Sequence, residues 1–168
     1  MFWTSILNGA AGHTYGANGI WQVNTQTKPF GASPHGQSWG DTPWEEAYQL
    51  PGSKQIGLGK QLLERYNWWR FEPHPEWVEP HWSDGDYFKP YAAGVPKEVR
   101  IIYIPAHGPR LSKIKEIELE INYHTFYFDP RSGKEYDLGT VIPDGNGEWQ
   151  PPKPPIIQDW VLVIEAKR

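Results

Sequence analysis

The residues of this chain that could carry out chemistry are carboxylates, aromatic rings and one histidine set among glycines. Glycoside hydrolysis uses two carboxyl groups, about 5 Å apart for retention of configuration or roughly 6.5–9.5 Å apart for inversion. The first half of the sequence offers Asp41, Glu45 and Glu46 as weak candidates. Glu45 and Glu46 also fit ordinary roles, as a capping partner and as part of a solvated helix face. The catalytic residues are therefore left unassigned.

Aromatic residues are abundant, with 10 Trp, 9 Tyr and 6 Phe. Trp and Tyr offer large apolar faces with one polar atom, which suits the C–H face of a sugar ring. Filling a core is the commoner role of any single Trp. His13 lies between glycines beside Tyr15, where it could hydrogen-bond a substrate. For His13, a buried structural histidine is the alternative.

Other classes of site and partner are not supported. The sequence has no Cys, and its remaining histidines are scattered without metal-ligand spacing, so no metal or cofactor is predicted. The net charge is −4 with no basic stripe, which argues against nucleic acid. No apolar run is long enough to cross a membrane. The N-terminus does not read as a signal peptide, so a secreted or periplasmic location would need a signal outside this sequence.

The first half of the chain reads as helices and loops around one strand. Residues 1–8 resemble a helix end, and residues 9–21 a buried strand that ends in a functional or tightly packed loop. A long loop follows over residues 24–40, and a capping box opens a helix at Thr42. After an interruption at Pro51, a second helix is expected from about Ser53 to Tyr66. Its inward face is predicted to contain Ile56, Leu62, Leu63 and Tyr66.

The second half reads as β structure after a proline-rich linker over residues 73–90. Short strands separated by turns are typical of a small sandwich. Alternation of Ile and Leu with Glu over residues 116–121 predicts a half-buried strand. The other predicted strands are residues 99–104, 123–128, 136–141 and 159–164.

Two groups of segments resemble a known family. Residues 9–21, with Thr42-Pro43-Trp44 and Leu50-Pro51-Gly52-Ser53, resemble the last strand, loop and helix of the apiosidase-like glycoside hydrolases. Residues 126–133 and 159–163 resemble the small C-terminal domain of those enzymes, which is often labelled collagen-binding. The two groups follow each other in the order found in the family.

The resemblance implies an eight-stranded α/β barrel whose active site lies at the C-terminal ends of the strands. It would place His13, Tyr15, Asn18 and Trp21 on the rim of a sugar-binding cleft, and with Trp44 these are the predicted substrate-binding residues. The family's catalytic carboxylates are expected on earlier strands, in sequence that would precede Met1. The chain is therefore expected to be truncated and to lack them.

The predicted fold class is α+β, with two successive regions. Residues 1–90 form a partial (β/α) barrel segment with a strand, a long loop, helices and a linker, and residues 91–168 form a small antiparallel β-sandwich domain. The expected function is that of a glycoside-hydrolase-like protein that acts on or binds a polysaccharide. The alternative is a non-catalytic module that binds carbohydrate or collagen.

The expected partners are a carbohydrate ligand and a second protein chain. An isolated barrel segment leaves open strand edges and apolar surface, which favours a homodimer, or a companion chain that supplies the other barrel strands. The contact is predicted to involve the N-terminal segment and the helix that contains Leu62 and Leu63. The competing expectation is that the N-terminal segment folds back onto the sandwich.

Overall fold

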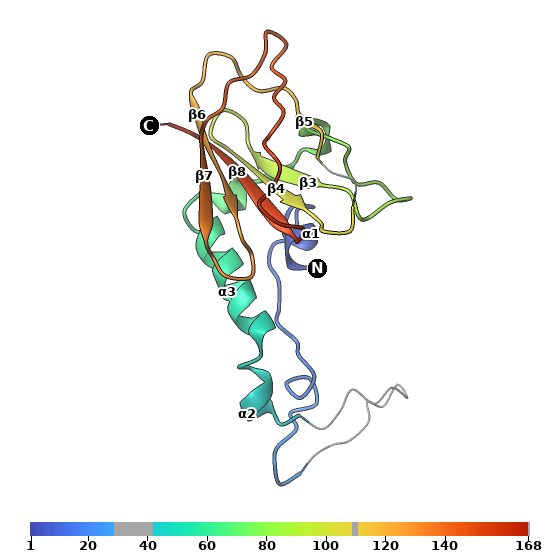
Figure 1. The fold of residues 1–168 in the computed structure, drawn as a ribbon. Coiled ribbons are helices and arrows are strands. Elements are labelled where there is room, and N and C mark those ends of the chain that lie inside the picture. The colour runs from blue at the N-terminus through green and yellow to red at the C-terminus, as the bar shows by residue number, and fades with distance from the viewer. Residues whose placement is uncertain (29–41, 109–110, 168) are drawn as a thin grey trace.

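The computed structural model describes residues 1–28, 42–108 and 111–167. Figure 1 shows two parts: a β-rich body (residues 72–108 and 111–167) and an extended part (residues 10–28 and 42–50) that projects away from it. The extended part carries helix α2 (Trp44–Ala47), and helix α3 (Pro51–Leu63) runs from there back to the body. Helix α1 (Phe2–Ile6) lies against the body.

The body is built on a six-stranded antiparallel sheet in the order β1-β3-β4-β8-β6-β7. A second, two-stranded sheet pairs β2 with β5. The strands of the large sheet are β1 (Glu72–Pro73), β3 (Tyr91–Val95), β4 (Val99–Ile104), β6 (Tyr123–Phe128), β7 (Glu135–Thr140) and β8 (Trp160–Ala166). The small sheet contains β2 (Val78–Glu79) and β5 (Lys113–Ile114), and two short 3-10 helices are η1 (Trp68–Arg70) and η2 (Pro75–Trp77).

Both faces of the large sheet are covered, which explains the sequences of its central strands. Along β8, Val161 and Val163 face one apolar layer, while Leu162 and Ile164 face the other. Successive side chains of a strand point to opposite faces, so a strand buried on both sides reads as a continuous apolar run. The runs over residues 99–104 and 159–164 predicted strands for this reason, and β4 and β8 confirm them.

Helices α1 and α3 supply the layer on one face of the sheet. Trp3 and Leu7 come from the N-terminal segment, Leu62 and Leu63 come from α3, and all four are buried in one cluster with the sheet. The sheet of the same chain covers Leu62 and Leu63, and the predicted dimer contact through the N-terminal segment and the helix that contains them stays a prediction. The competing expectation is that the N-terminal segment folds back onto the β unit. The burial of Trp3 and Leu7 against the sheet agrees with it.

The small sheet and its flanking loops cover the opposite face. Val78 and Ile114 are fully buried there together with Trp77. Arg100, also buried, places its guanidinium 4.2 Å from the centre of the Trp77 ring and 2.7 Å from a carboxylate oxygen of Glu118. The charge of Arg100 is thus paired and held against an aromatic face within an otherwise apolar layer.

The N-terminal segment differs from its prediction in one element. Residues 9–21 form no strand, and the described residues before β1 contain none. Gly9 and Gly19 adopt φ angles of +86° and +97°, a left-handed backbone that breaks an extended strand. The α+β class, with helices and loops preceding an antiparallel β unit, is confirmed.

Both helix starts also differ from the prediction. The N-cap of α2 is Pro43, and its helix start has no side-chain capping hydrogen bond, so the capping box from Thr42 to Glu45 does not form. Pro51 opens α3 instead of interrupting a helix. Proline is favoured in the first turn, because the N–H group that it lacks has no partner there.

Two other predicted segments are corrected. Residues 116–121 are not a strand: Glu116 has φ +58°, and Leu119 is 58% exposed. Ile117 is buried and Leu119 is exposed, so the alternating sequence does not correspond to the buried and exposed faces of a strand. Residues 73–90, predicted as a linker, contribute to β1 and β2 and bury Trp77 in the core. Strands β6 and β7 lie where strands were expected.

Candidate functional site

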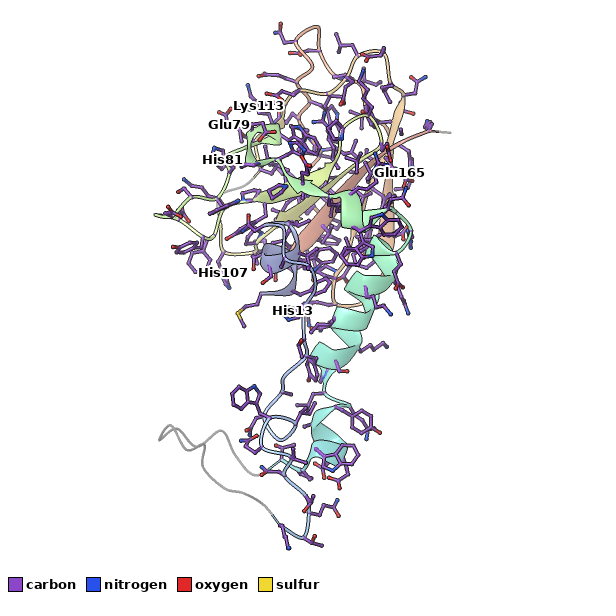
Figure 2. The ribbon with its side chains drawn as sticks, turned by 180° about the vertical axis from the view of Figure 1, so that it is seen from behind. His13, Glu79, His81, His107, Lys113 and Glu165 are labelled. Atoms are coloured by element: carbon purple, nitrogen blue, oxygen red, sulfur yellow. The ribbon has the colours of Figure 1, made fainter. Side chains whose placement is uncertain are left out.

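The structure divides the predicted substrate-binding residues between two places. His13 lies where the extended part joins the body, as Figure 2 shows. Its ring meets that of Phe2 edge-on, with 5.6 Å between the ring centres. His13 also lines a pocket of about 210 Å³ between α1 and α3. The walls are mainly apolar, and the other lining residues are Phe2, Ile6, Gly12, Ile56, Lys60, Leu63, Glu64 and Trp68.

Hydrogen bonds of the side chains and the backbone involve three of the other predicted residues, Tyr15, Asn18 and Trp44, within the extended part. The Nε2 group of Gln22 donates to Oδ1 of Asn18 at 2.5 Å, and the backbone N–H of Trp44 donates to the carbonyl of Asn24 at 2.8 Å. The hydroxyl of Tyr15 donates to the carbonyl of Ala47 at 3.3 Å. These bonds join the turn at residues 18–24 to α2, so Tyr15 and Asn18 contribute to the architecture of the extended part.

Three aromatic side chains of the extended part are open to solvent. Trp21 is 75% exposed, and Trp44 and Tyr48 are each about half exposed. The rings of Trp44 and Tyr48, here called the aromatic pair, lie one turn apart on α2, with 6.0 Å between their centres. Because water covers these rings, they are available to a ligand. The structure thus places Trp21 and Trp44 where ligand contact is possible.

Glu45 and Glu46, the two candidate carboxylates that the structure describes, do not face each other. Glu45 is half-buried, and its Oε2 is buried without a hydrogen-bond partner among the described residues. Glu46 follows it on α2 and is exposed, so the two point in different directions, about 100° apart on a helix. Asp41 lies outside the described residues. The arrangement of Glu45 and Glu46 therefore does not match the facing carboxyl groups of a glycosidase.

A larger groove, of about 820 Å³, lies between the end of α3 and the sheet. On one side of it, the hydroxyl of Tyr66 donates to Glu165 at 2.6 Å, and Glu165 lies 3.2 Å from Nδ1 of His124. Nε2 of His124 lies 2.9 Å from a carboxylate oxygen of Asp137. This polar chain joins the segment after α3 to strands β8, β6 and β7. Figure 2 shows Glu165 on the body, far from His13.

Burial and the hydrogen bonds of this polar chain shift the pKa values of its members. Burial, together with the hydrogen bond to Glu165, raises the pKa of Tyr66, so its phenol stays protonated and donates. Burial opposes the charging of His124, but its hydrogen bonds with Asp137 and Glu165 outweigh this and raise its pKa. The backbone N–H of Gly139, followed by the bond with His124, lowers the pKa of Asp137. The groove therefore contains an imidazole, that of His124, whose pKa lies above its ordinary value.

Sequence reasoning did not find this groove. Tyr66 and Glu165 are 99 positions apart, and His124 and Glu165 are 41 apart. No local spacing connects them, since their proximity comes from the pairing of β6 with β8 and from the docking of α3. One signal was available in the sequence: Glu165 directly follows the buried apolar run of β8, and a polar side chain at the end of a buried strand can mark a site.

No cluster of three or more metal-ligating side chains occurs in the described part of the chain. No helix among the same residues is long and apolar enough to span a membrane.

Comparison with protein-family models gives two consecutive matches. Residues 1–70 match the model described as "Apiosidase-like, catalytic domain". Residues 88–165 match the model described as "Putative collagen-binding domain of a collagenase". The match boundaries separate the helical segment from the β unit, although the core layer under α1 and α3 contains residues of both.

Two solved structures share the fold. One, described as a glycoside hydrolase, has a TM-score of 0.70 and 19% identity, and the match covers 98% of this chain and 35% of that one. The other, a glycoside hydrolase family 5 protein from Bacteroides vulgatus, has a TM-score of 0.71 and 18% identity, with 98% and 34% coverage. The chain spans about a third of the length of these structures. No curated protein matches it.

Proposed function

We propose that this chain, which resembles the C-terminal part of an apiosidase-like glycoside hydrolase, binds a polysaccharide through its extended part. The observation that carries the proposal is the solvent-exposed aromatic pair, Trp44 and Tyr48, within the segment that matches the catalytic-domain model. Aromatic faces stack on the C–H faces of sugar rings. A carbohydrate-related function is also what the matched family and the glycoside hydrolase fold support.

The proposed role is binding, without hydrolysis by Glu45 and Glu46. Both known geometries of glycoside hydrolysis need two carboxyl groups that flank one glycosidic bond. Glu46 points into solvent while Glu45 is half-buried beside it, so these two do not flank a common space. A hydrolytic site would need carboxylates from elsewhere, such as those of a companion chain that completes a barrel.

The test of binding is affinity electrophoresis through gels that contain soluble plant or microbial polysaccharides. The variant Trp44→Ala/Tyr48→Ala should bind about thirtyfold more weakly than the unmodified chain, because it removes two aromatic contacts and stacking contributes about 1 kcal/mol per contact. Trp69→Ala is the matched control, since Trp69 is 70% exposed but lies in η1, outside the extended part. Equal loss in both variants would place the site elsewhere, and no retardation in any gel would refute polysaccharide binding.

The same preparations test hydrolysis. Release of reducing sugar from these polysaccharides, or of the chromophore from aryl-glycosides, is expected to stay at the background level. Turnover that is lost in Glu45→Gln but not in Glu46→Gln would overturn the binding-only role and assign chemistry to Glu45. Turnover unchanged in both variants would direct the search to other carboxylates or to a contaminating enzyme.

Collagen binding is the second candidate function, and the match of residues 88–165 favours it. Phe88, at the start of that match, is exposed, and Tyr87 beside it is also exposed. Co-sedimentation with fibrillar collagen distinguishes the two functions. Collagen binding that survives Trp44→Ala/Tyr48→Ala and is lost in Phe88→Ala would assign collagen to the β unit.

Self-association, or docking with a companion chain, stays a proposal that needs a surface other than Leu62 and Leu63. The extended part offers exposed Trp21, Val23 and Leu50. Light scattering over a hundredfold dilution range separates a monomer from a dimer. A dimer that is lost in Trp21→Ala would place the contact in the extended part, and a monomer at every concentration would refute the homodimer.

A further inference from the structure

The groove between the end of α3 and the sheet joins the two parts of the chain that match different family models. Arg65, Tyr66 and Asn67 come from the first match, and the other lining residues come from the second match or, for Ala166 and Lys167, directly follow it. The volume of about 820 Å³ falls within the range of small-molecule sites, about 300–1,000 Å³. The remaining lining residues are Val95, Lys97, Glu98, Val99, His124, Glu165, Ala166 and Lys167.

The anionic groups of this groove are already engaged. Glu98 accepts two hydrogen bonds from the guanidinium of Arg70, at 2.8 and 2.9 Å. Glu165 accepts from the buried Tyr66 hydroxyl and lies next to His124. Because both carboxylates have close donors, they repel an incoming anion less than free carboxylates would.

The cationic groups are less engaged. Nζ of Lys167 donates to the hydroxyl of Thr140 at 2.6 Å and makes no ion pair with a carboxylate among the described residues. Nζ of Lys97 pairs with Glu120 at 3.1 Å, but both side chains are well exposed, and such pairs are weak. Arg65 is paired with Glu135. Lys97 and Lys167 therefore leave positive charge available at the groove.

We infer that this groove binds an acidic sugar, a pyranose ring that bears a carboxylate. The carboxylate would lie near Lys97 and Lys167, where a charge-assisted hydrogen bond is available. The ring hydroxyls would meet His124, Glu165 and the amide of Asn67, of which the carboxylate accepts hydrogen bonds and the amide both donates and accepts. The sugar part of this inference rests on the proposed carbohydrate function, and the acidic part rests on the charges of the groove.

The test is an NMR titration of the isotope-labelled full chain with D-glucuronate and D-galacturonate. Saturable shifts are expected at the backbone amides of Lys97, His124 and Lys167, and at least one of the two sugars should cause them. Glucose and galactose, which lack the carboxylate, should bind at least about tenfold more weakly, since a hydrogen bond to a charged group is lost. Inorganic phosphate and acetate test for a general anion site.

Two variants make the test specific. Lys167→Ala should weaken the binding of the acidic sugar about tenfold, and Lys97→Ala should act in the same direction. Lys153→Ala is the matched control, because Lys153 is exposed and does not line the groove. All three positions are on the surface or partly exposed, so unchanged spectra outside the groove would show that the variants fold. Equal affinity in Lys167→Ala and Lys153→Ala would overturn the inference.

Failure of this inference can be told apart from failure of the proposed function. Polysaccharide binding through the aromatic pair, with no acidic-sugar shifts in the groove, would overturn the inference alone. Acidic-sugar shifts in the groove with no polysaccharide binding would overturn the proposed function alone. Shifts of the same size with phosphate or acetate would reduce the groove to an unspecific anion site and overturn the sugar assignment.

Discussion

In the β-rich body, Trp160 is 1% exposed and packs between Tyr127 and Tyr136, whereas in the extended part Trp21 is 75% exposed. The body buries the two faces of one sheet under separate apolar layers. The extended part buries only Gly19, Asn24 and Ala47 among its described residues. The same residue type, tryptophan, therefore serves as core in one region and as exposed surface in the other.

The difference shows that the contacts that stabilise this chain are concentrated in one region. Burial of apolar area is the main favourable contribution to folding, and the body, together with α1 and α3 packed against it, contains nearly all of it. The extended part is held by backbone hydrogen bonds, such as that from Trp44 to Asn24, and by α3, which joins it to the body. Its exposed aromatic rings contribute little to folding, so they are free to contact a ligand.

The largest expected effect comes from replacing each of these two tryptophans with alanine. Trp160→Ala should lower the free energy of unfolding by about 3–5 kcal/mol, because it removes a fully buried ring and its hydrogen bond to the carbonyl of Ile156. Trp21→Ala should change it by less than about 0.5 kcal/mol, as expected for an exposed residue. Urea denaturation monitored by circular dichroism measures both. A loss above about 2 kcal/mol in Trp21→Ala would show that the extended part is packed more tightly than its exposure indicates.

The sequence predicted the body better than the extended part, for a physical reason. The runs at residues 99–104 and 159–164 are apolar because both faces of the sheet are covered, so each strand could be recognised from its own residues. Strand β3 was missed because Tyr91 follows a proline-rich stretch and its Ala-Ala-Gly sequence has weak β-propensity. Residues 9–21 were misread as a strand because small residues fit both a buried strand and a tight loop.

The groove could not be predicted, since it depends on how separate elements dock. Tyr66 was expected to face inward, and it does so in part, but its partner Glu165 lies at the other end of the chain. His124 reaches Asp137 through the pairing of β6 with β7, which includes a bulge after Thr125. The register of a sheet and the position of a bulge are set by the whole fold. Among the predicted site residues, the exposure of Trp21 and Trp44 likewise could not be derived from spacing.

The next effect in size tests the tightest point of the extended part. Gly19 has φ +97°, and a Cβ atom there would lie 2.3 Å from the carbonyl oxygen of Thr42. Gly19→Ala should therefore destabilise the contact between the turn and α2 by about 1–3 kcal/mol. Hydrogen exchange should show faster exchange for the amides of Asn24 and Trp44, with the strands of the body unchanged.

Gly12→Ala is the matched control, because nothing lies within 4 Å of a Cβ atom at that position and its φ is not in the left-handed region. It should leave the exchange rates of the extended part unchanged. Faster exchange throughout the sheet in Gly19→Ala would contradict the separation of the two regions, since the turn would then contribute to the stability of the body.

The smallest effect concerns His124, at the groove where the segment after α3 meets the sheet. Its pKa is raised above the ordinary 6.5, because the hydrogen bonds with Asp137 and Glu165 outweigh burial. The stabilisation from charged His124 is therefore complete below pH 6.5 and is lost as the pH rises through the higher pKa of the folded state. The pKa of Asp137 is lowered from 3.8, so its share is present above that value and is lost in stronger acid. Together they predict a modest stability maximum between about pH 4 and 6.5.

NMR titration of the histidine rings measures this directly. The midpoint of His124 should lie above the ordinary 6.5, and it should fall in Asp137→Asn and in Glu165→Gln, because each removes an acceptor that favours the charged ring. His124→Gln should flatten the decline in stability between pH 6.5 and 8. A His124 midpoint below 6.5 would mean that burial outweighs the two carboxylates. The positive charge of the groove above that midpoint would then come from Arg65, Lys97 and Lys167, without a contribution from His124.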